Sequence, residues 1–396
     1  MTAFNRDTDF STPLPIGGSV RPPRAGRLPS LEIGRGLAAL AVVMFHANAG
    51  SRLVGGPDLH WMRALEHGVD FFFVLSGFII FAAHADDIGK RGQILPYLLK
   101  RGIRLFPLLW LVVIGYAALR ILAGDTVDPM TLLRSLLPWP TLEDGAPVVV
   151  WTLRHEWLFY AVFALLIWRP ATGWPVLFLW VAGSLLQIAL VLAGEQGFSG
   201  SAAMIFSSYT IDFAFGLALG LAFRHRNFRS RWLALYCGIG LLCMVLWLEE
   251  SLDLNRHGVS DYLSLGALIW TPVLGAAFAI IVFGLLCVDR YISSRNWLIS
   301  LGSASYAIYL VHTPVNAVLL RGADFLPATL VQQGFLYPLL IGGGVGAGFA
   351  LHYGFERPVS AWLKRRLLPR RTTERNTDTD GTVSVAHAKR STDTIR

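Results

Sequence analysis

Long apolar segments recur along this 396-residue sequence, and they limit what the chain can fold into. A helix needs about 20 mostly apolar residues to cross a bilayer, and about ten such windows can be drawn. Charged residues make up 15% of the chain, against about 25% in soluble domains. We therefore predict an all-α, polytopic membrane protein with about ten transmembrane helices. The windows are Gly36–Leu53, Gly68–His84, Ile103–Ala123, Trp151–Trp168, Trp174–Gly194, Ile205–Phe223, Trp232–Leu248, Leu263–Val288, Leu298–Leu320 and Gln333–Phe355.

Lysine and arginine alternate from loop to loop. They gather around residues 21–35, 90–104, 224–231, 290–295 and 357–371, whereas the intervening loops contain fewer of them and several acidic residues. Cytoplasmic loops of membrane proteins are enriched in Lys and Arg, so both termini are expected in the cytoplasm. This bias, together with attraction to anionic lipids, explains the net charge of +8 without any nucleic-acid partner.

Composition divides the chain into three regions. We expect a polar cytoplasmic segment at residues 1–30, a transmembrane domain at 31–362, and a disordered, basic and polar cytoplasmic tail at 363–396. The three cysteines, Cys237, Cys243 and Cys287, fall inside apolar windows without CxxC spacing, so they indicate neither a disulfide framework nor a metal site.

Arg35 and His46 are the most informative ionisable residues in the first window. Their spacing of eleven residues is close to three helical turns, which places both on one face and about 16 Å apart along the axis. An arginine at the cytoplasmic end can bind phosphate, and a histidine inside the bilayer can accept a proton from a hydroxyl. Alternatively, Arg35 anchors the helix at the interface and His46 makes an interhelical hydrogen bond.

Two acidic residues begin later windows. Glu156 lies in the segment 151–160 beside Arg154 and His155, where it could orient an imidazole, bind an acceptor hydroxyl or pair with Arg154. Asp70 begins the second window, where a carboxylate is also favoured by the helix dipole.

The remaining candidates lie near the ends of other windows. Arg101 and Arg104 share a helical face and could hold coenzyme A phosphates, although the positive-inside rule alone would place arginines there. His312 precedes Pro314 and could line a cavity at a proline kink or be a packing histidine. Glu356 ends the last window and could pair with Arg357 or a neighbouring arginine.

Six segments in this order resemble the acyltransferase 3 membrane proteins, which include O-antigen, exopolysaccharide and antibiotic O-acyltransferases. The Arg35–His46 pair, residues 68–77, and Arg101-Gly-Ile-Arg104 resemble three of the family's motifs. Residues 151–160, 305–312 and 355–358 are similar to three more, and the resemblance covers about residues 31–362. Arg154 and His155 stand where many members have Ser and Val, and the hydrolase-like domain of some members is absent from this sequence.

The resemblance implies an inner-membrane, acyl-CoA-dependent acyltransferase. The donor, acetyl-CoA above all, would bind on the cytoplasmic side through Arg35, Arg101 and Arg104. His46 would activate a hydroxyl of a saccharide or lipid-linked saccharide acceptor, with Glu156 orienting its ring, or would take the acyl group itself. Asp70, His312 and Glu356 are further candidate site residues; no metal is expected. A saccharide or lipid transporter would also have such helices, although no inverted repeat is visible.

Overall fold

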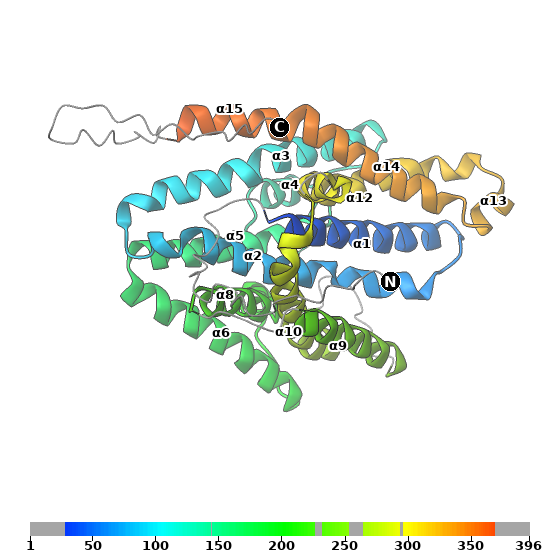
Figure 1. The fold of residues 1–396 in the computed structure, drawn as a ribbon. Coiled ribbons are helices and arrows are strands. Elements are labelled where there is room, and N and C mark those ends of the chain that lie inside the picture. The colour runs from blue at the N-terminus through cyan, green and yellow to red at the C-terminus, as the bar shows by residue number, and fades with distance from the viewer. Residues whose placement is uncertain (1–27, 144, 226–231, 253–263, 294–295, 369–396) are drawn as a thin grey trace, which may run out of the picture.

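The chain folds as a bundle of helices (Figure 1). The computed structural model describes residues 28–143, 145–225, 232–252, 264–293 and 296–368. Every regular element in these ranges is a helix, which confirms the predicted all-α class. The expected N-terminal segment and C-terminal tail fall mostly outside the described residues.

Eight helical stretches of the described residues are long and apolar enough to cross a membrane. They contain α1 (Pro29–Leu53), η1 (His60–His67) with α2 (Gly68–His84), α3 (Ile94–Leu122), α5 (Val150–Trp168), α6 (Pro170–Leu192), α7 (Gly200–Ile205) with α8 (Tyr209–His225), α9 (Trp232–Ser251) and α10 (Leu265–Val288). The second stretch also includes the short turn η2 (Ala85–Asp87), and the third includes η3 (Arg91–Gln93). The helix α4 (Pro129–Leu136) lies between the third and fourth stretches, and η4 (Asp289–Tyr291) follows the eighth.

The last two predicted windows are helical but interrupted, so a count of ten is not confirmed. The ninth is divided at Ala304 into α11 (Trp297–Ser303) and α12 (Ser305–Arg321). The short elements η5 (Ala323–Phe325) and α13 (Ala328–Gln332) follow. The tenth forms α14 (Leu336–Leu351) and then a π-helical turn, η6 (His352–Glu356), which continues into α15 (Arg357–Leu367). Single π turns in helices are frequently found at functional sites.

Helix α1, dark blue in Figure 1, lies at the centre of the bundle and packs against α2, α10, α11, α12 and α14. Small residues allow the closest of these crossings. A Cβ atom at Gly302 in α11 would overlap the backbone oxygen of Glu32 in α1, so only glycine permits this approach. Such close packing of small residues is a common way for membrane helices to associate. It fixes the N-terminal end of α1, where Arg35 lies, against α11.

Candidate active site

An internal cavity of about 80 Å³ lies among α1, α2, α3, α5 and α12. Its charged lining comes from three helices: Arg35 from α1, Arg101 and Arg104 from α3, and Glu156 from α5. Aromatic and aliphatic side chains, together with two serines and one threonine, form the remaining wall. These residues are Val69, Phe72, Phe73, Leu75, Ser76, Ile79, Ile80, Leu105, Thr152, Leu153, Tyr160, Ser305, Tyr306 and Tyr309.

A second, larger chamber of about 980 Å³ is also lined by Arg35, Arg101 and Arg104. Lys100, Arg357 and Lys364 add three more cations to its wall, and Glu32 and Glu356 contribute carboxylates. This chamber lies among α1, α3, α11, η6 and α15, the segments in which the basic residues of the sequence are concentrated. The three shared arginines therefore stand where the wide basic chamber adjoins the narrow internal cavity.

The protein holds two of these arginines in place by different contacts. Arg35, only 8% exposed, lies with Nη1 3.3 Å from both carboxylate oxygens of Glu32, one turn earlier on α1. The guanidinium carbon of Arg101 lies 5.8 Å from the ring centre of Tyr97 and 5.6 Å from that of Tyr160. This is a cation–π sandwich, which is worth more when it is desolvated. Within the described part of the chain, the buried Arg101 Nε has no hydrogen-bond acceptor, so it retains capacity to bind an anion.

Glu156 contacts a tyrosine and not an imidazole. The hydroxyl of Tyr160, one turn later on α5, donates a short hydrogen bond to Glu156 Oε1. The neighbouring Arg154 donates to the backbone carbonyls of Thr141 and Glu143, and His155 contacts the hydroxyl of Ser207 at 3.0 Å. The expected orientation of His46 by Glu156 does not appear among these contacts. Glu156 instead lies in the cavity wall with the three arginines.

His46 and His312 form a pair between α1 and α12. His46 Nδ1 lies 3.0 Å from the carbonyl oxygen of Val42 and 3.2 Å from His312 Nε2, and His312 Nδ1 lies 3.1 Å from the carbonyl oxygen of Ile308. A carbonyl only accepts hydrogen bonds, so these partners assign the proton to Nδ1 in each neutral ring. His46 Nε2 then has a free lone pair, because the described residues place no hydrogen-bond partner on it. A general base requires such a lone pair.

The histidine pair lies next to the cavity but does not line it. Neither His46 nor His312 belongs to the wall of the cavity or of the chamber, so Arg35 and His46 do not share an open space. The Tyr309 side chain lies between the cavity and the histidine pair. It lines the cavity, and its ring centre is 5.9 Å from the ring centre of His312. The Tyr309 hydroxyl is 2.8 Å from Thr152 Oγ1, which itself donates to the carbonyl of Val149. Tyr309 thus connects α12 to α5 between the cavity and the histidines.

Glu356 and Asp70 occupy different surroundings. Glu356 lies in the chamber wall and accepts a hydrogen bond of 2.8 Å from His352 Nδ1 across the π turn, whereas the sequence suggested an arginine partner. Asp70 is fully buried and lies 3.5 Å from His67 Nδ1, outside both cavities. The structure therefore brings Arg35, Arg101, Arg104, Glu156 and Glu356 together, pairs His46 with His312, and sets Asp70 apart.

Four aromatic or imidazole side chains of this region were not singled out from the sequence: Tyr160, Tyr306, Tyr309 and His352. Two of these residues could have been found from the sequence. Tyr160 follows Glu156 by four residues and His352 precedes Glu356 by four, and side chains at this spacing lie together on a helix. The Tyr306 hydroxyl donates to the carbonyl of Leu105 on α3, a contact between distant segments that no local pattern reveals.

Comparisons with known proteins agree with this architecture. Residues 28–356 match a family described as an acyltransferase domain, the acyltransferase 3 type. The chain is 28% identical over 341 residues to the exopolysaccharide production protein ExoZ of Rhizobium meliloti, covering 77% of this chain and 92% of that protein. It is 27% identical over 385 residues to the acyltransferase MdmB of Streptomyces mycarofaciens, covering 87% and 95% respectively. No solved structure matches the chain significantly. Since the match spans most of the sequence and includes every candidate site residue, the chain belongs to the acyltransferase 3 family and is a multi-pass membrane acyltransferase.

Proposed function

We propose that this protein transfers an acyl group, acetyl in the simplest case, from acyl-CoA to a hydroxyl of a cell-envelope saccharide. The observation that carries the proposal is the position of Arg35, Arg101 and Arg104 between the basic chamber and the internal cavity. Family membership supports acyl transfer over transport, and the saccharide acceptor rests on the similarity to an exopolysaccharide production protein. The proposed location is the inner membrane, with both termini and the chamber on the cytoplasmic side.

The donor would bind with its two chemically different ends in the two spaces. Coenzyme A has a phosphorylated nucleotide, which suits a wide chamber with six lysine and arginine side chains in its wall. Guanidinium groups bind phosphate oxygens in a bidentate manner, and this favours Arg101 and Arg104 as phosphate ligands. The slender pantetheine arm would then pass the arginines into the cavity, whose volume of about 80 Å³ fits a narrow chain and not a nucleotide.

His46 would act as the general base for the acceptor hydroxyl. Its Nε2 lone pair takes the hydroxyl proton as the oxygen attacks the thioester carbonyl, and the thiolate of coenzyme A leaves. His312 supports the required tautomer through its contact with His46 Nδ1. Because Tyr309 separates the histidine pair from the cavity, the Tyr309 side chain must turn aside for the thioester to reach His46. Transfer through an acyl-histidine follows the same path, with Nε2 as the nucleophile.

The proposal is tested with labelled acetyl-CoA and envelope saccharide in membranes that contain the intact chain. Arg104→Ala should raise the KM for acetyl-CoA by about 10- to 100-fold, the loss expected for one charge-assisted hydrogen bond. Arg91→Gln is the matched control, because Arg91 is an exposed arginine just before α3 that lines neither space.

Two outcomes would contradict different parts of the proposal. An unchanged KM for acetyl-CoA in Arg104→Ala and Arg101→Ala would remove the phosphate-binding assignment. Transfer from an acyl donor without coenzyme A, together with no transfer from acetyl-CoA, would overturn the donor class and leave the acyltransferase itself in place.

A further inference from the structure

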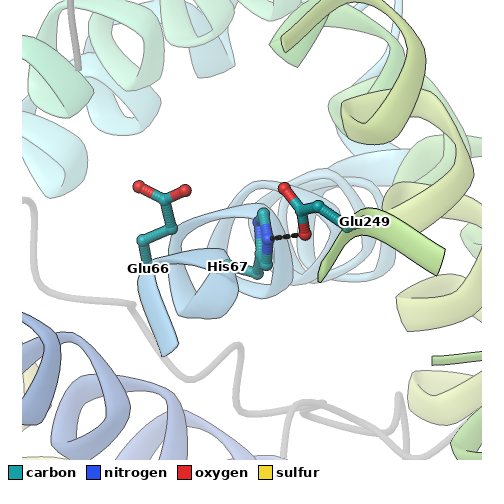
Figure 2. A group of neighbouring side chains, drawn as sticks. All are labelled: Glu66, His67 and Glu249. Atoms are coloured by element: carbon teal, nitrogen blue, oxygen red, sulfur yellow. Dashed lines mark hydrogen bonds and ion pairs between the residues drawn. The ribbon is translucent and has the colours of Figure 1, made fainter. Parts of the chain in front are cut away.

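A cluster of metal-ligating side chains lies outside both cavities, where η1 meets α2 and α9 ends (Figure 2). It consists of Glu66, His67 and Glu249, whose ligand atoms all lie within 4.8 Å of one another. His67 is 2% exposed and Glu249 is 4% exposed, while Glu66 is half-buried at the edge. Glu66 and His67 are neighbours in the sequence, whereas Glu249 follows His67 by 182 residues. The cluster contains no cysteine.

Both ring nitrogens of His67 face carboxylates. His67 Nε2 lies 2.7 Å from Glu249 Oε2, and Nδ1 lies 3.5 Å from Oδ2 of the fully buried Asp70. When a histidine binds a metal through one nitrogen, its other N–H commonly donates to a carboxylate, which fixes the tautomer and makes the ring a better ligand. Asp70 occupies the position of such a supporting carboxylate. This is an observation separate from the convergence of the three ligand side chains.

Charge favours a cation here. Three carboxylates, those of Glu66, Asp70 and Glu249, converge on one imidazole, and two of them are almost completely buried. A buried carboxylate is costly in a low-dielectric environment unless it is paired with positive charge or coordinates a metal. A divalent ion is attracted to such a concentration of carboxylates, and binding through Nε2 lets the imidazole remain neutral.

We propose that this cluster is a site for a divalent transition-metal ion of the Zn²⁺ or Mn²⁺ class. The ligands are His67 Nε2 and one carboxylate oxygen each from Glu66 and Glu249, and water completes the coordination. Imidazole nitrogen with carboxylate oxygen is a donor set suited to these ions. Metal–ligand bonds of about 2.0–2.2 Å place two ligand atoms of one ion about 3.0–3.5 Å apart, so the 2.7 Å contact of His67 Nε2 with Glu249 Oε2 must open slightly, and any ligand pair at the 4.8 Å limit of the cluster must close. On binding, the proton between His67 and Glu249 is released to solvent.

The bound ion would tie the start of α2 to the end of α9. Helix α9 packs mainly against α10, and α10 packs against α2 and α8. Because α2 supplies much of the cavity wall, a tie at its first turn would hold that wall against the α9–α10 pair. The site does not depend on the proposed acyl donor or on the histidine pair.

The test uses the full-length protein in detergent, stripped with a chelator and then titrated with Zn²⁺ and, separately, Mn²⁺. Calorimetry and elemental analysis should find one equivalent bound, and the ion should raise the Tm. Glu249→Gln should weaken binding by at least tenfold and abolish the Tm increase. Glu250→Gln is the matched control: Glu250 is the next residue of α9, it is exposed, and it is not part of the cluster, so this variant should bind like the wild type.

Glu66→Gln provides a second variant if Glu249→Gln fails to fold, since the half-buried Glu66 lies at the edge of the cluster. It should also weaken binding, and a cooperative thermal transition of the metal-free variant shows that it is folded. Absence of saturable binding to the wild type would overturn the proposal and leave His67 and Glu249 as an ordinary hydrogen-bonded pair. Equal binding by wild type, Glu249→Gln and Glu66→Gln would also overturn it, because the ion would then be bound elsewhere.

Discussion

His46 Nδ1 lies 3.2 Å from His312 Nε2, although the two histidines are 266 residues apart. Each ring also contacts the carbonyl four residues earlier in its own helix, so backbone groups fix both tautomers. The two rings have different capacities as a result. His312 Nε2 is engaged with His46, whereas the lone pair of His46 Nε2 faces no hydrogen-bond partner in the described ranges. The proposed roles follow from this difference: His46 as the base and His312 as a positioning residue.

The first prediction concerns this pair. His46→Gln should reduce acyl transfer by about 10²- to 10⁴-fold, the usual contribution of a positioned general base. His312→Gln should lower kcat by a smaller factor and leave the KM for acyl-CoA unchanged, because it removes the support and not the base. The measurement is the initial rate of labelled acyl transfer, normalised to the amount of protein in the membrane.

His60→Gln is the control for the histidine variants, since His60 is an exposed histidine at the start of η1. It should transfer acyl groups at the wild-type rate. The proposed role of His46 would be discarded if His46→Gln retained wild-type kcat, or if His312→Gln were the more damaging of the two substitutions.

The second prediction concerns Tyr160, which contacts Glu156 through its hydroxyl and Arg101 through its ring. Tyr160→Phe should keep the cation–π contact and lose only the hydrogen bond, so the KM for acyl-CoA should change little while kcat falls. Tyr160→Leu should lose both contacts and raise that KM as well, because Arg101 is no longer held between two rings. Steady-state kinetics separate the two effects. An equal increase in KM for both variants would show that the ring does not position Arg101.

Much of the helical fold was predictable, because a bilayer demands long apolar segments and the chain displays them. The gathering of Arg35, Arg101 and Arg104 was also expected, whereas Glu156 was expected beside His46 and lies in the cavity wall with the arginines. What local patterns could not reveal is which helices meet. The spacing of Arg35 and His46 places them on one helical stripe, but different helices cover that stripe along its length. At His46 the neighbouring residue is His312 on α12. The cavity lined by Arg35 therefore does not reach His46.

The interruptions in the last two windows were equally hidden. The break at Ala304 and the π turn at residues 352–356 lie in segments whose composition suits a continuous helix. Close packing of α11 on α1 accompanies the break at Ala304, a tertiary contact that no local pattern reveals, and the His352–Glu356 hydrogen bond spans the π turn. Asp70 looked like an ordinary helix-start carboxylate, since its partner His67 precedes the predicted window.

The third prediction concerns pH and the loop after α1, where Asp58 lies between two predicted spans. A hydrogen bond from Arg63 is the main cause that lowers the pKa of Asp58, and Asn48 and Arg52 act in the same direction. A lowered pKa in the folded state means that the stabilisation is present above the ordinary aspartate pKa of about 3.9 and is lost as the pH falls through the lower folded value. Asp58→Asn should therefore lower the Tm near neutral pH, and the difference from wild type should vanish in acid.

The effect at Asp58 should be small, less than about 1 kcal/mol, because the ion pairs are partly exposed to solvent. Thermal unfolding of the detergent-solubilised protein across the acid range measures it. Glu195→Gln, at an exposed carboxylate after α6, is the control substitution measured alongside it. A Tm difference for Asp58→Asn that persists unchanged into acid would contradict the assignment to the ionised carboxylate.

The fourth prediction compares two helical glycines. At Gly302 a Cβ would overlap the backbone oxygen of Glu32, whereas at Gly346 in α14 no atom lies within 4 Å of such a Cβ. Gly302→Ala should destabilise the protein by about 1–3 kcal/mol, as overpacking does, because two backbones must separate. Gly346→Ala should be neutral or stabilising by up to about 1 kcal/mol, since alanine favours helix over glycine.

Gly302→Ala should also change the site, because the crossing of α1 and α11 holds the end of α1 that positions Arg35. Its KM for acyl-CoA should rise, while that of Gly346→Ala stays at the wild-type value. Thermal unfolding and transfer kinetics on the same preparations provide both readings. Equal stabilities for the two variants would mean that the crossing is looser than the contact of Gly302 with Glu32 indicates. If Gly302→Ala were destabilised but its KM for acyl-CoA were unchanged, the packing of α1 on α11 would not be required for donor binding. Arg35 would then keep its place without the close approach of α11.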